Sequence, residues 1–133
     1  MPHLKKILLV DDDAEDRFIV FDALNSLDCS SLLMYAENGE AAIQILKTID
    51  HVSDLPCLVV LDLNMPKMNG TETLRYLKSS SIYQHIPVII YSTSENDLER
   101  DKCLNLGAHD YIIKPSSVKE WKKTTELLLS FCG

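Results

Sequence analysis

The stretch LVVLDLNMPKMNG, residues 58–70, decides how this chain folds. Four apolar residues open it, a run typical of a strand that is buried on both faces of a parallel sheet. Asp62 follows the run directly, where an uncompensated buried charge would be costly. Pro66 and Gly70 then bracket a loop. The stretch therefore predicts a buried strand that delivers one carboxylate to the edge of a sheet.

Apolar runs and amphipathic stretches alternate on both sides of this segment. Strands are predicted at residues 7–10, 32–36, 57–61, 88–91 and 111–113. Helices are predicted at residues 14–27, after Asn38, at residues 71–78, after Ser94, and from Ser117 to about residue 131. Five strands in strict alternation with five helices predict an α/β fold: a five-stranded parallel sheet, doubly wound as a flavodoxin-like (βα)5 arrangement.

Polar residues and a glycine at the helix ends support these positions. Asn38 is expected to cap the second helix. Residues 94–97, SEND, resemble a capping box that starts at Ser94, and residues 117–120, SVKE, form a full capping box for the last helix. Gly107 is placed to end the fourth helix.

The composition limits the classes of function. The chain has 20 Asp and Glu against 13 Lys and Arg, a formal net charge of −7, so its surface repels phosphate backbones and direct nucleic-acid binding is not expected. A length of 133 residues predicts one domain over residues 1–133. The apolar run Ile7–Val10 is too short for a signal peptide or a membrane span, which predicts a cytoplasmic protein.

The four cysteines are expected to be ordinary thiols that bind no metal. Cys29, Cys57, Cys103 and Cys132 form no CxxC pair, and no histidine lies at zinc-ligand spacing from them. In a cytoplasmic protein this pattern predicts four reduced thiols. Cys132, near the end of the chain, is expected to be the most exposed to oxidation.

Chemically active side chains follow four of the five predicted strands. Residues 11–13 are three aspartates after the first strand, Asp62 ends the third, Ser92 follows the fourth and Lys114 follows the fifth. Ligands in open α/β sheets bind beyond the carboxyl ends of the strands. We therefore expect these acids, one hydroxyl and one amine to converge on one edge of the sheet.

The carboxylates predict a Mg²⁺ site. Clustered acids repel one another unless a cation or a proton intervenes, and Mg²⁺ prefers oxygen ligands. We assign Asp11 and Asp12 to the metal because Asp62 converges on them, whereas Asp13 is expected to cap the following helix. Asp62 itself is expected to be a nucleophile, since a carboxylate can attack phosphorus to form an acyl phosphate.

Lys114 and Ser92 complete the predicted phosphoryl-transfer site. The lysine ammonium would pair with the resting carboxylate and later with a phosphoryl oxygen. The Ser92 hydroxyl can donate a hydrogen bond to another phosphoryl oxygen. Ser92 is preferred because it comes directly after the strand, with Thr93 and Ser94 as the alternatives.

Four segments, spread over nearly the whole chain, form one combined sequence pattern. They are ILLVDDD (7–13), LVVLDLNMPKMNG (58–70), PVIIYSTSE (87–95) and GAHDYIIKPSS (107–117). Together they resemble the response-regulator receiver domain of two-component signalling, in its single-domain, chemotaxis-regulator-like form. The resemblance implies a lone receiver domain without an output domain, with Asp62 as the phosphoacceptor.

The resemblance also implies which residues hold the cofactor, Mg²⁺. Asp12 matches the direct metal ligand of the family, and Asp11 matches the water-mediated one. Asn64, two residues after Asp62, matches the position whose backbone carbonyl completes the metal shell.

A second group of matches implies a conformational switch. Ser92 matches the switch hydroxyl, and Tyr111 matches the aromatic residue that turns inward when the hydroxyl moves to the phosphoryl group. Lys114 matches the family lysine. The bond between Lys114 and Pro115 matches one that is often cis in the family.

A signalling protein, not an enzyme, is what the resemblance implies. A sensor histidine kinase or a histidine phosphotransfer protein would donate the phosphoryl group to Asp62, and the altered surface would then act on a downstream protein. A motor, a kinase, another phosphorelay protein and a second copy of the chain are the candidate targets. Neither nucleic acid nor membrane is an expected partner.

Three other interpretations stay open. A receiver relic would bind protein partners without phosphorylation, although the acid, hydroxyl and lysine set is intact. A small phosphatase of the haloacid-dehalogenase type also uses an aspartyl phosphate, but its nucleophile follows the first strand in a DxD pattern. A flavodoxin-like electron carrier needs a phosphate-binding loop after the first strand, where this chain has three aspartates that would repel a flavin phosphate.

Overall fold

Five parallel strands form one sheet in the order β2-β1-β3-β4-β5, with β3 at its centre. The computed structural model describes residues 5–132, except for the side chain of Val118. The strands are β1 (Ile7–Val10), β2 (Leu33–Ala36), β3 (Leu58–Asp62), β4 (Val88–Ser92) and β5 (Asp110–Ile113). The predicted doubly wound, flavodoxin-like α/β fold is confirmed.

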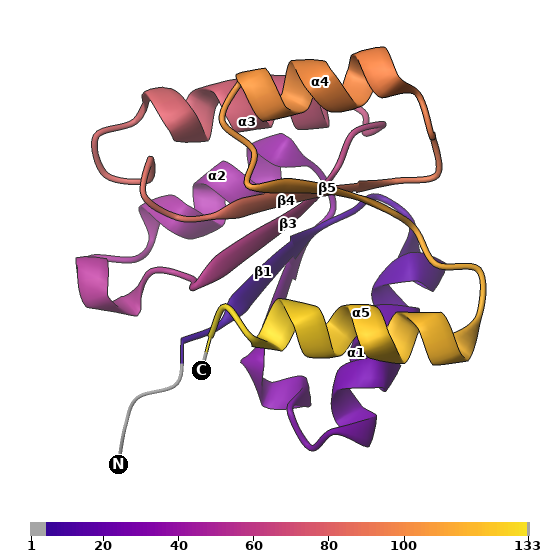
Figure 1. The fold of residues 1–133 in the computed structure, drawn as a ribbon. Helices are drawn as coiled ribbons and strands as arrows, with labels where there is room; N and C mark the ends of the chain where they lie inside the picture. The colour runs from indigo at the N-terminus through magenta and orange to yellow at the C-terminus, as the bar shows by residue number, and fades with distance from the viewer. Residues whose placement is uncertain (1–4, 133) are drawn as a thin grey trace.

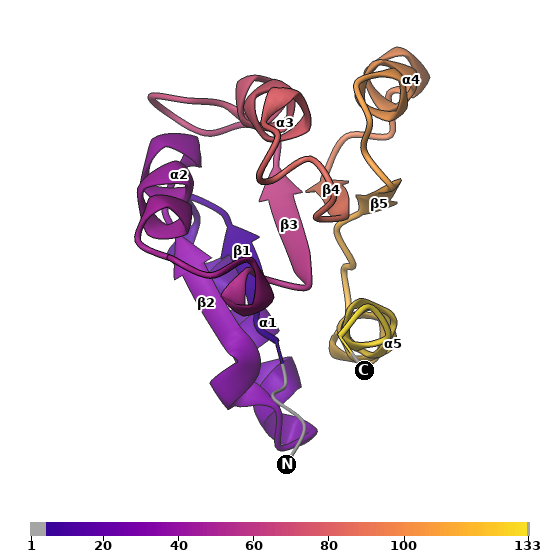
Figure 2. The same ribbon diagram turned by 90° about the vertical axis from the view of Figure 1, so that its left-hand side faces the viewer.

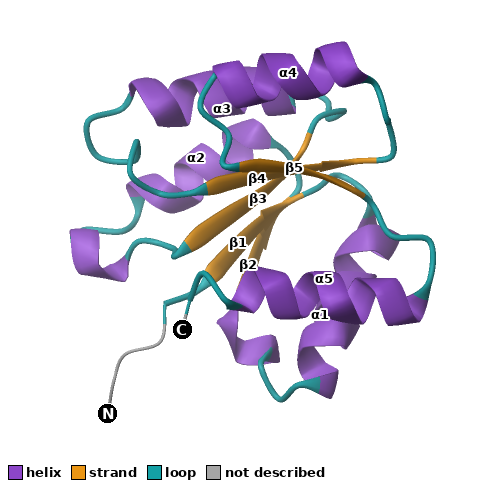
Figure 3. Ribbon diagram, in the orientation of Figure 1, coloured by secondary structure: helices purple, strands orange, loops and turns teal. Residues whose placement is uncertain are grey.

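Helices cover both faces of the sheet (Figure 1). They are α1 (Ala14–Ser26), α2 (Gly39–Lys47), α3 (Gly70–Ser79), α4 (Asp97–Asn105) and α5 (Val118–Leu129). Helices α1 and α5 lie on one face and α2, α3 and α4 on the other (Figure 3), and the turned view shows the twisted strands between α3 and α5 (Figure 2). None of these helices is long and apolar enough to cross a membrane.

Alternation along the strands divides the core into two halves. Leu8 and Val10 of β1 pack on the side of α2, α3 and α4, whereas Ile7 and Leu9 pack on the side of α1 and α5. Every residue of β1, β3 and β4 is buried, as expected for strands covered on both faces. Trp121 of α5 is buried in the second half of the core. Packing therefore fixes β1, β3 and β4 along their whole length, as far as the carboxyl ends where the predicted site lies.

Most of the predicted helix ends are confirmed. Asn38 caps α2 by accepting a backbone N–H of the first turn at 2.8 Å. Gly107 follows the last residues of α4 with a φ of +108°, a conformation that favours glycine. Ser117 caps α5 by accepting the N–H of Glu120 at 3.2 Å, but the Glu120 carboxylate accepts the N–H of Ser116 and so does not close a full capping box.

Helix α4 begins later than the sequence predicted, because Asn96 and not Ser94 is its N-cap. The Asn96 side-chain oxygen accepts the N–H groups of Leu98 at 2.9 Å and Glu99 at 3.2 Å. The Ser94 hydroxyl instead accepts the N–H of Asn96 at 3.3 Å. An Asn side chain that satisfies two helix donors stabilises this start more than a serine further from the helix can.

Hydrogen bonds at the start of α3 fix the loop that follows β3. Asn69 and Glu72 form a capping box, with Asn69 accepting the Glu72 N–H at 3.0 Å. The Gly70 N–H donates to the Leu63 carbonyl at 3.0 Å, and a Cβ on Gly70 would lie only 2.7 Å from the Leu63 Cα. Only glycine therefore allows α3 to approach the end of β3 this closely, and the approach holds the chain next to Asp62.

A disulfide overturns the prediction of four reduced thiols. Cys57, just before β3, is paired with Cys132, just after α5, across a sequence separation of 75 residues. Cys29 and Cys103 are free thiols. Spacing along the chain carried no sign of the pairing, because the fold alone returns the end of α5 to the amino-terminal end of β3.

Candidate functional site

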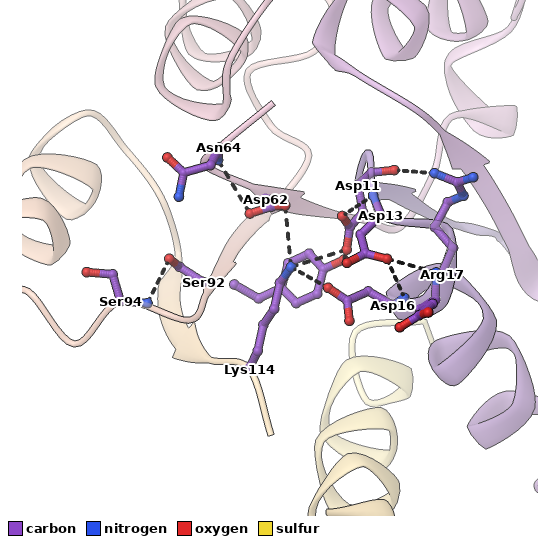
Figure 4. A network of polar contacts seen from close by, with 11 residues as sticks. Asp11, Asp13, Asp16, Arg17, Asp62, Asn64, Ser92, Ser94 and Lys114 are labelled. Atoms are coloured by element: carbon purple, nitrogen blue, oxygen red, sulfur yellow. Dashed lines mark hydrogen bonds and ion pairs between the residues drawn. The ribbon is translucent and has the colours of Figure 1, made fainter. Parts of the chain in front are cut away.

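The side chains predicted to converge do so at the carboxyl edge of the sheet, around the ammonium of Lys114 (Figure 4). Its Nζ lies 2.7 Å from a carboxylate oxygen of Asp16 and 3.4 Å from oxygens of Asp11 and of Asp62. Burial alone would lower the pKa of Lys114, but the three acids outweigh it and raise the pKa above the ordinary value. The lysine is therefore a fixed positive charge.

Asp11 is the most enclosed acid of the site, with no exposed surface. One carboxylate oxygen accepts the backbone N–H of Asp13 at 2.9 Å. The other accepts a hydrogen bond from the hydroxyl of Tyr91 and faces Lys114. Burial and the charge of Asp11 raise the pKa of Tyr91, so its hydroxyl keeps the proton and acts as donor. These partners offset the cost of burying the carboxylate.

Asp62 ends β3 and leaves only 6% of its surface exposed. Burial raises the pKa of this carboxyl to about 6; Lys114 lowers it, and the like charge of Asp11 raises it. One oxygen accepts the N–H of Asn64 at 3.4 Å, and the other faces Lys114. A carboxylate with so few strong partners is poorly compensated and is suited to attack an electrophile or bind a cation.

A cation-binding cluster is present among the described residues. Carboxylate oxygens of Asp11, Asp12 and Asp62 lie within 4.8 Å of one another, with Asp12 exposed to solvent. With Asp16, the site holds four carboxylates and one ammonium. An excess of closely spaced carboxylate oxygens that is open on one side fits a hard divalent cation such as Mg²⁺, which keeps part of its water shell.

Asp13 is the N-cap of α1, as predicted. Its side chain accepts the N–H groups of Glu15 at 2.9 Å and Asp16 at 3.4 Å. Arg17, one turn further on, donates to the backbone carbonyl of Asp11 at 2.7 Å. The start of α1 therefore fixes the backbone that carries the first two acids.

Ser92 and Tyr111 lie on the neighbouring strands β4 and β5. Ser92 is 1% exposed, and its hydroxyl accepts the N–H of Ser94 at 3.1 Å. Tyr111 is also buried, and its hydroxyl donates to the Ser94 carbonyl at 2.9 Å. Both residues of the predicted switch therefore contact the same residue of the β4–α4 loop. Thr93, the first alternative to Ser92, is exposed.

Two residues that hold the site together were missed by the sequence analysis. Asp16 makes the shortest ion pair to Lys114, and a sign of it was present, because it stands in the first turn of the helix that Asp13 caps. Tyr91 packs its ring 4.6 Å below the Lys114 ammonium. Its place in an apolar strand made it look like a core residue, which it also is.

One detail implied by the family resemblance comes out differently, and a second one stays a prediction. The bond between Lys114 and Pro115 is trans, like every peptide bond in the described part of the chain. The trans form is the lower in energy for most such bonds. Asn64, two residues after Asp62, donates its backbone N–H to the Asp62 carboxylate, and the metal-binding role of its carbonyl stays a prediction.

A doubly wound α/β fold with an acidic cluster and a buried lysine at the carboxyl edge of its strands defines a receiver-type domain. The family model of the response regulator receiver domain matches residues 7–126. The chain belongs to this family, which works in two-component signalling. Aspartate phosphorylation and Mg²⁺ binding at an acidic cluster are typical of the family.

Individual relatives agree with this assignment. The chain is 32% identical over 124 residues to the chemotaxis protein CheY1 of Helicobacter pylori, covering 93% of this chain and 96% of that protein. It also matches the protein-glutamate methylesterase/protein-glutamine glutaminase of Clostridium acetobutylicum, at 36% identity, but spans only 34% of its length.

Solved structures give the same result. The phosphorylated cyanobacterial phytochrome response regulator RcpA superimposes with a TM-score of 0.84 at 28% identity, covering 98% of this chain and 94% of that one. The Mn²⁺-bound form of the response regulator Rcp1 superimposes with a TM-score of 0.79 at 30% identity, covering 96% and 93%.

Replacing Asp62 by Asn is expected to stabilise the metal-free fold at neutral pH. Because folding raises the pKa of Asp62 from 3.8 to about 6, its contribution to stability is present below pH 4 and is lost as the pH rises through 6. In EDTA, Asp62→Asn should raise the free energy of unfolding at pH 7 by about 2–3 kcal/mol and change it little at pH 4. Urea denaturation at both pH values measures this.

The control for charge alone is Asp22→Asn, on the exposed surface of α1. It should leave the free energy of unfolding nearly unchanged. The explanation by burial is wrong if Asp62→Asn has the same effect at both pH values, or if Asp22→Asn reproduces it.

Replacing Tyr91 by Phe is expected to destabilise the fold. The ring below Lys114 stays, but one oxygen of the buried Asp11 loses its hydroxyl donor. The free energy of unfolding, measured by urea denaturation in EDTA at pH 7, should fall by about 1–3 kcal/mol. Tyr35→Phe is the matched control, since Tyr35 is 56% exposed and its loss of a hydroxyl should cost little. Equal stability of the Tyr91 variant and the wild type would contradict this role.

Proposed function

We propose that this receiver domain takes a phosphoryl group onto Asp62 in a Mg²⁺-dependent reaction, from a phosphohistidine of a sensor kinase or of a histidine phosphotransfer protein. The observation that carries the proposal is the poorly compensated carboxylate of Asp62, buried between Asp11 and Lys114 at the edge where ligands bind open sheets. The family and the phosphorylated relative RcpA support it.

The residues of the acidic cluster would hold the metal. Asp12 and Asp62 would bind Mg²⁺ directly, Asp11 would bind it through water, and the backbone carbonyl of Asn64 would complete the shell. When bound there, Mg²⁺ offsets the negative charge that phosphoryl oxygens bring to the carboxylates. The excess of carboxylates over ammonium groups in the site supports this assignment.

The chain's own groups carry out the transfer. A carboxylate oxygen of Asp62 forms a bond to phosphorus as the bond from phosphorus to the donor imidazole breaks, and the imidazole keeps the electron pair. Lys114 stays protonated and exchanges part of its contact with Asp62 for a phosphoryl oxygen, because Asp11 and Asp16 still hold the ammonium in place.

The phosphoryl group would then bias a two-state switch. Its oxygens offer the Ser92 hydroxyl a charged acceptor, so the hydroxyl moves toward Asp62 and its bond with the Ser94 N–H weakens. Tyr111 holds the carbonyl of the same Ser94, so the β4–α4 loop and the tyrosine respond together. Phosphorylation acts as a ligand with unequal affinity for two conformations.

The signal would leave by protein contact, and the domain is a switch with no substrate turnover of its own. The downstream partner is a protein that recognises the altered surface of α4, β5 and α5, or a second copy of the chain. The net charge of −7 opposes direct binding of nucleic acid.

Acetyl phosphate with Mg²⁺ is expected to add one phosphoryl group to the wild-type protein, as measured by intact mass spectrometry. Asp62→Ala and an EDTA sample should both abolish the added mass, whereas Asp22→Ala should keep it. Labelling by acetyl phosphate would establish the chemistry, and labelling by a phosphorylated sensor kinase would establish the natural donor.

No added mass with either donor would contradict the proposal. The protein would then be a receiver that binds its partners without phosphorylation. Labelling that persists in Asp62→Ala would place the chemistry on another residue.

Beryllofluoride, a phosphoryl mimic, is expected to change the amide NMR signals of residues 92–97 and 110–113 in the wild type. Ser92→Ala should bind the mimic with the signals of residues 110–113 almost unchanged, since the hydroxyl that links the two sites is gone. Thr93→Ala is the matched control and should respond like the wild type. The proposed coupling is wrong if Ser92→Ala shows the full wild-type response.

A further inference from the structure

We propose that Cys57 and Cys132 form a reversible thiol–disulfide site that tethers the end of α5 to the start of β3. The two residues are paired, and their Cα atoms lie 5.3 Å apart, within the range of disulfides. The site is independent of the proposed phosphoryl transfer, because Cys57 and Asp62 lie at opposite ends of β3, roughly 16 Å apart.

Cys57 is accessible to a small reagent. It is partly buried and lines a groove of about 330 Å³ together with Lys5, His85 and Phe131. The thiolate is the form of a cysteine that attacks a disulfide. Cys103, in contrast, is 1% exposed and stays out of reach.

The fold accommodates the reduced state as well as the oxidised one. The Cys57 sulfur lies 3.3 Å from the Lys6 carbonyl oxygen, so the thiol formed by opening the bond would have an acceptor within reach. The backbone N–H of Cys57 donates to the same carbonyl at 2.9 Å, a bond that does not involve the sulfur. Opening the bond therefore leaves β3 anchored and frees only the last turn after α5.

That last turn packs on the sheet through apolar side chains, among them Phe131 and Cys132, and its backbone hydrogen bonds stay within its own segment. The Cys132 N–H donates to the Leu129 carbonyl at 2.9 Å, a bond within its own segment. Beyond it, the ring of Phe131 packs edge-on against His109 at 5.1 Å. Among the described residues, the disulfide is the one covalent cross-link between this turn and β3, and it adds to the apolar packing that holds the end of α5.

The oxidant in this proposal is a low-molecular-weight disulfide of the glutathione type. The Cys57 thiolate attacks one of its sulfurs, which forms a mixed disulfide and releases one small thiol. Cys132, as its thiolate, then attacks the Cys57 sulfur, closes the protein disulfide and releases a second small thiol. One small disulfide is reduced to two thiols as two protein thiols become one disulfide, and excess thiol reverses both steps.

The test equilibrates the folded, full-length protein with mixtures of oxidised and reduced glutathione. An acid quench, alkylation in denaturant and intact mass spectrometry then count the free thiols, with the buried Cys103 included. We expect the count to change from four to two as the mixture becomes oxidising. The oxidised protein should melt about 10 °C higher than the reduced one, because the bond closes a long loop of the unfolded chain.

Variants separate this site from the other thiols. Cys132→Ser should trap one glutathionyl group on Cys57 and should melt at the same temperature with or without reductant. Cys29→Ser is the matched control and should keep the whole melting shift. The wild type compared in its two redox states supplies the same answer without any substitution.

Three results would overturn the proposal. One is four free thiols at every glutathione ratio, and another is an oxidised protein that excess reduced glutathione cannot open while it stays folded. The third is a glutathionyl group on Cys29 instead of Cys57 in Cys132→Ser. Acetyl phosphate labelling of Asp62 should be the same in both redox states, so this proposal and the proposed function can fail separately.

Discussion

The ammonium of Lys114, held among three carboxylates, is the interaction on which the rest of this structure depends. Asp11 follows β1, Asp16 lies in α1 and Asp62 ends β3. Without a positive charge between them, their burial at one edge would be strongly unfavourable. The lysine compensates part of this charge and leaves the remainder for a divalent cation. The stability of the sheet edge and the proposed reactivity of Asp62 therefore depend on the same arrangement.

Strand alternation gives the two sides of this site different tasks. Tyr91 and Ser92 are neighbours in β4, yet Tyr91 packs toward α1 and α5 and bonds to Asp11. Tyr111 of β5 packs toward α2, α3 and α4 and meets the β4–α4 loop with Ser92. The first side fixes the acids, and the second carries the hydroxyl groups of the proposed switch.

The sequence predicted the fold and most of the site because both depend on short, regular patterns. Apolar runs located all five strands, and the residues directly after them located Asp11, Asp62, Ser92 and Lys114. Side chains whose partners are distant in the sequence were harder to predict. Tyr91 stands in an apolar run and Asp16 among the acids at a helix start, so neither stood out as a site residue. The pairing of Cys57 with Cys132 depends on where α5 ends in space, which no local pattern specifies.

The close approach at Gly70 has a directional consequence for the whole domain. Because α3 packs against the end of β3 without room for a methyl group on Gly70, the backbone next to Asp62 has little space to move toward α3. A phosphoryl group on Asp62 would therefore find no room on the side of α3. The β4–α4 loop, which follows Ser92, contacts Ser92 and Tyr111 through hydrogen bonds of Ser94. Under the proposed phosphorylation, a structural change at Asp62 would therefore be accommodated on the side of the β4–α4 loop and β5, and a partner bound there would affect Asp62 in return.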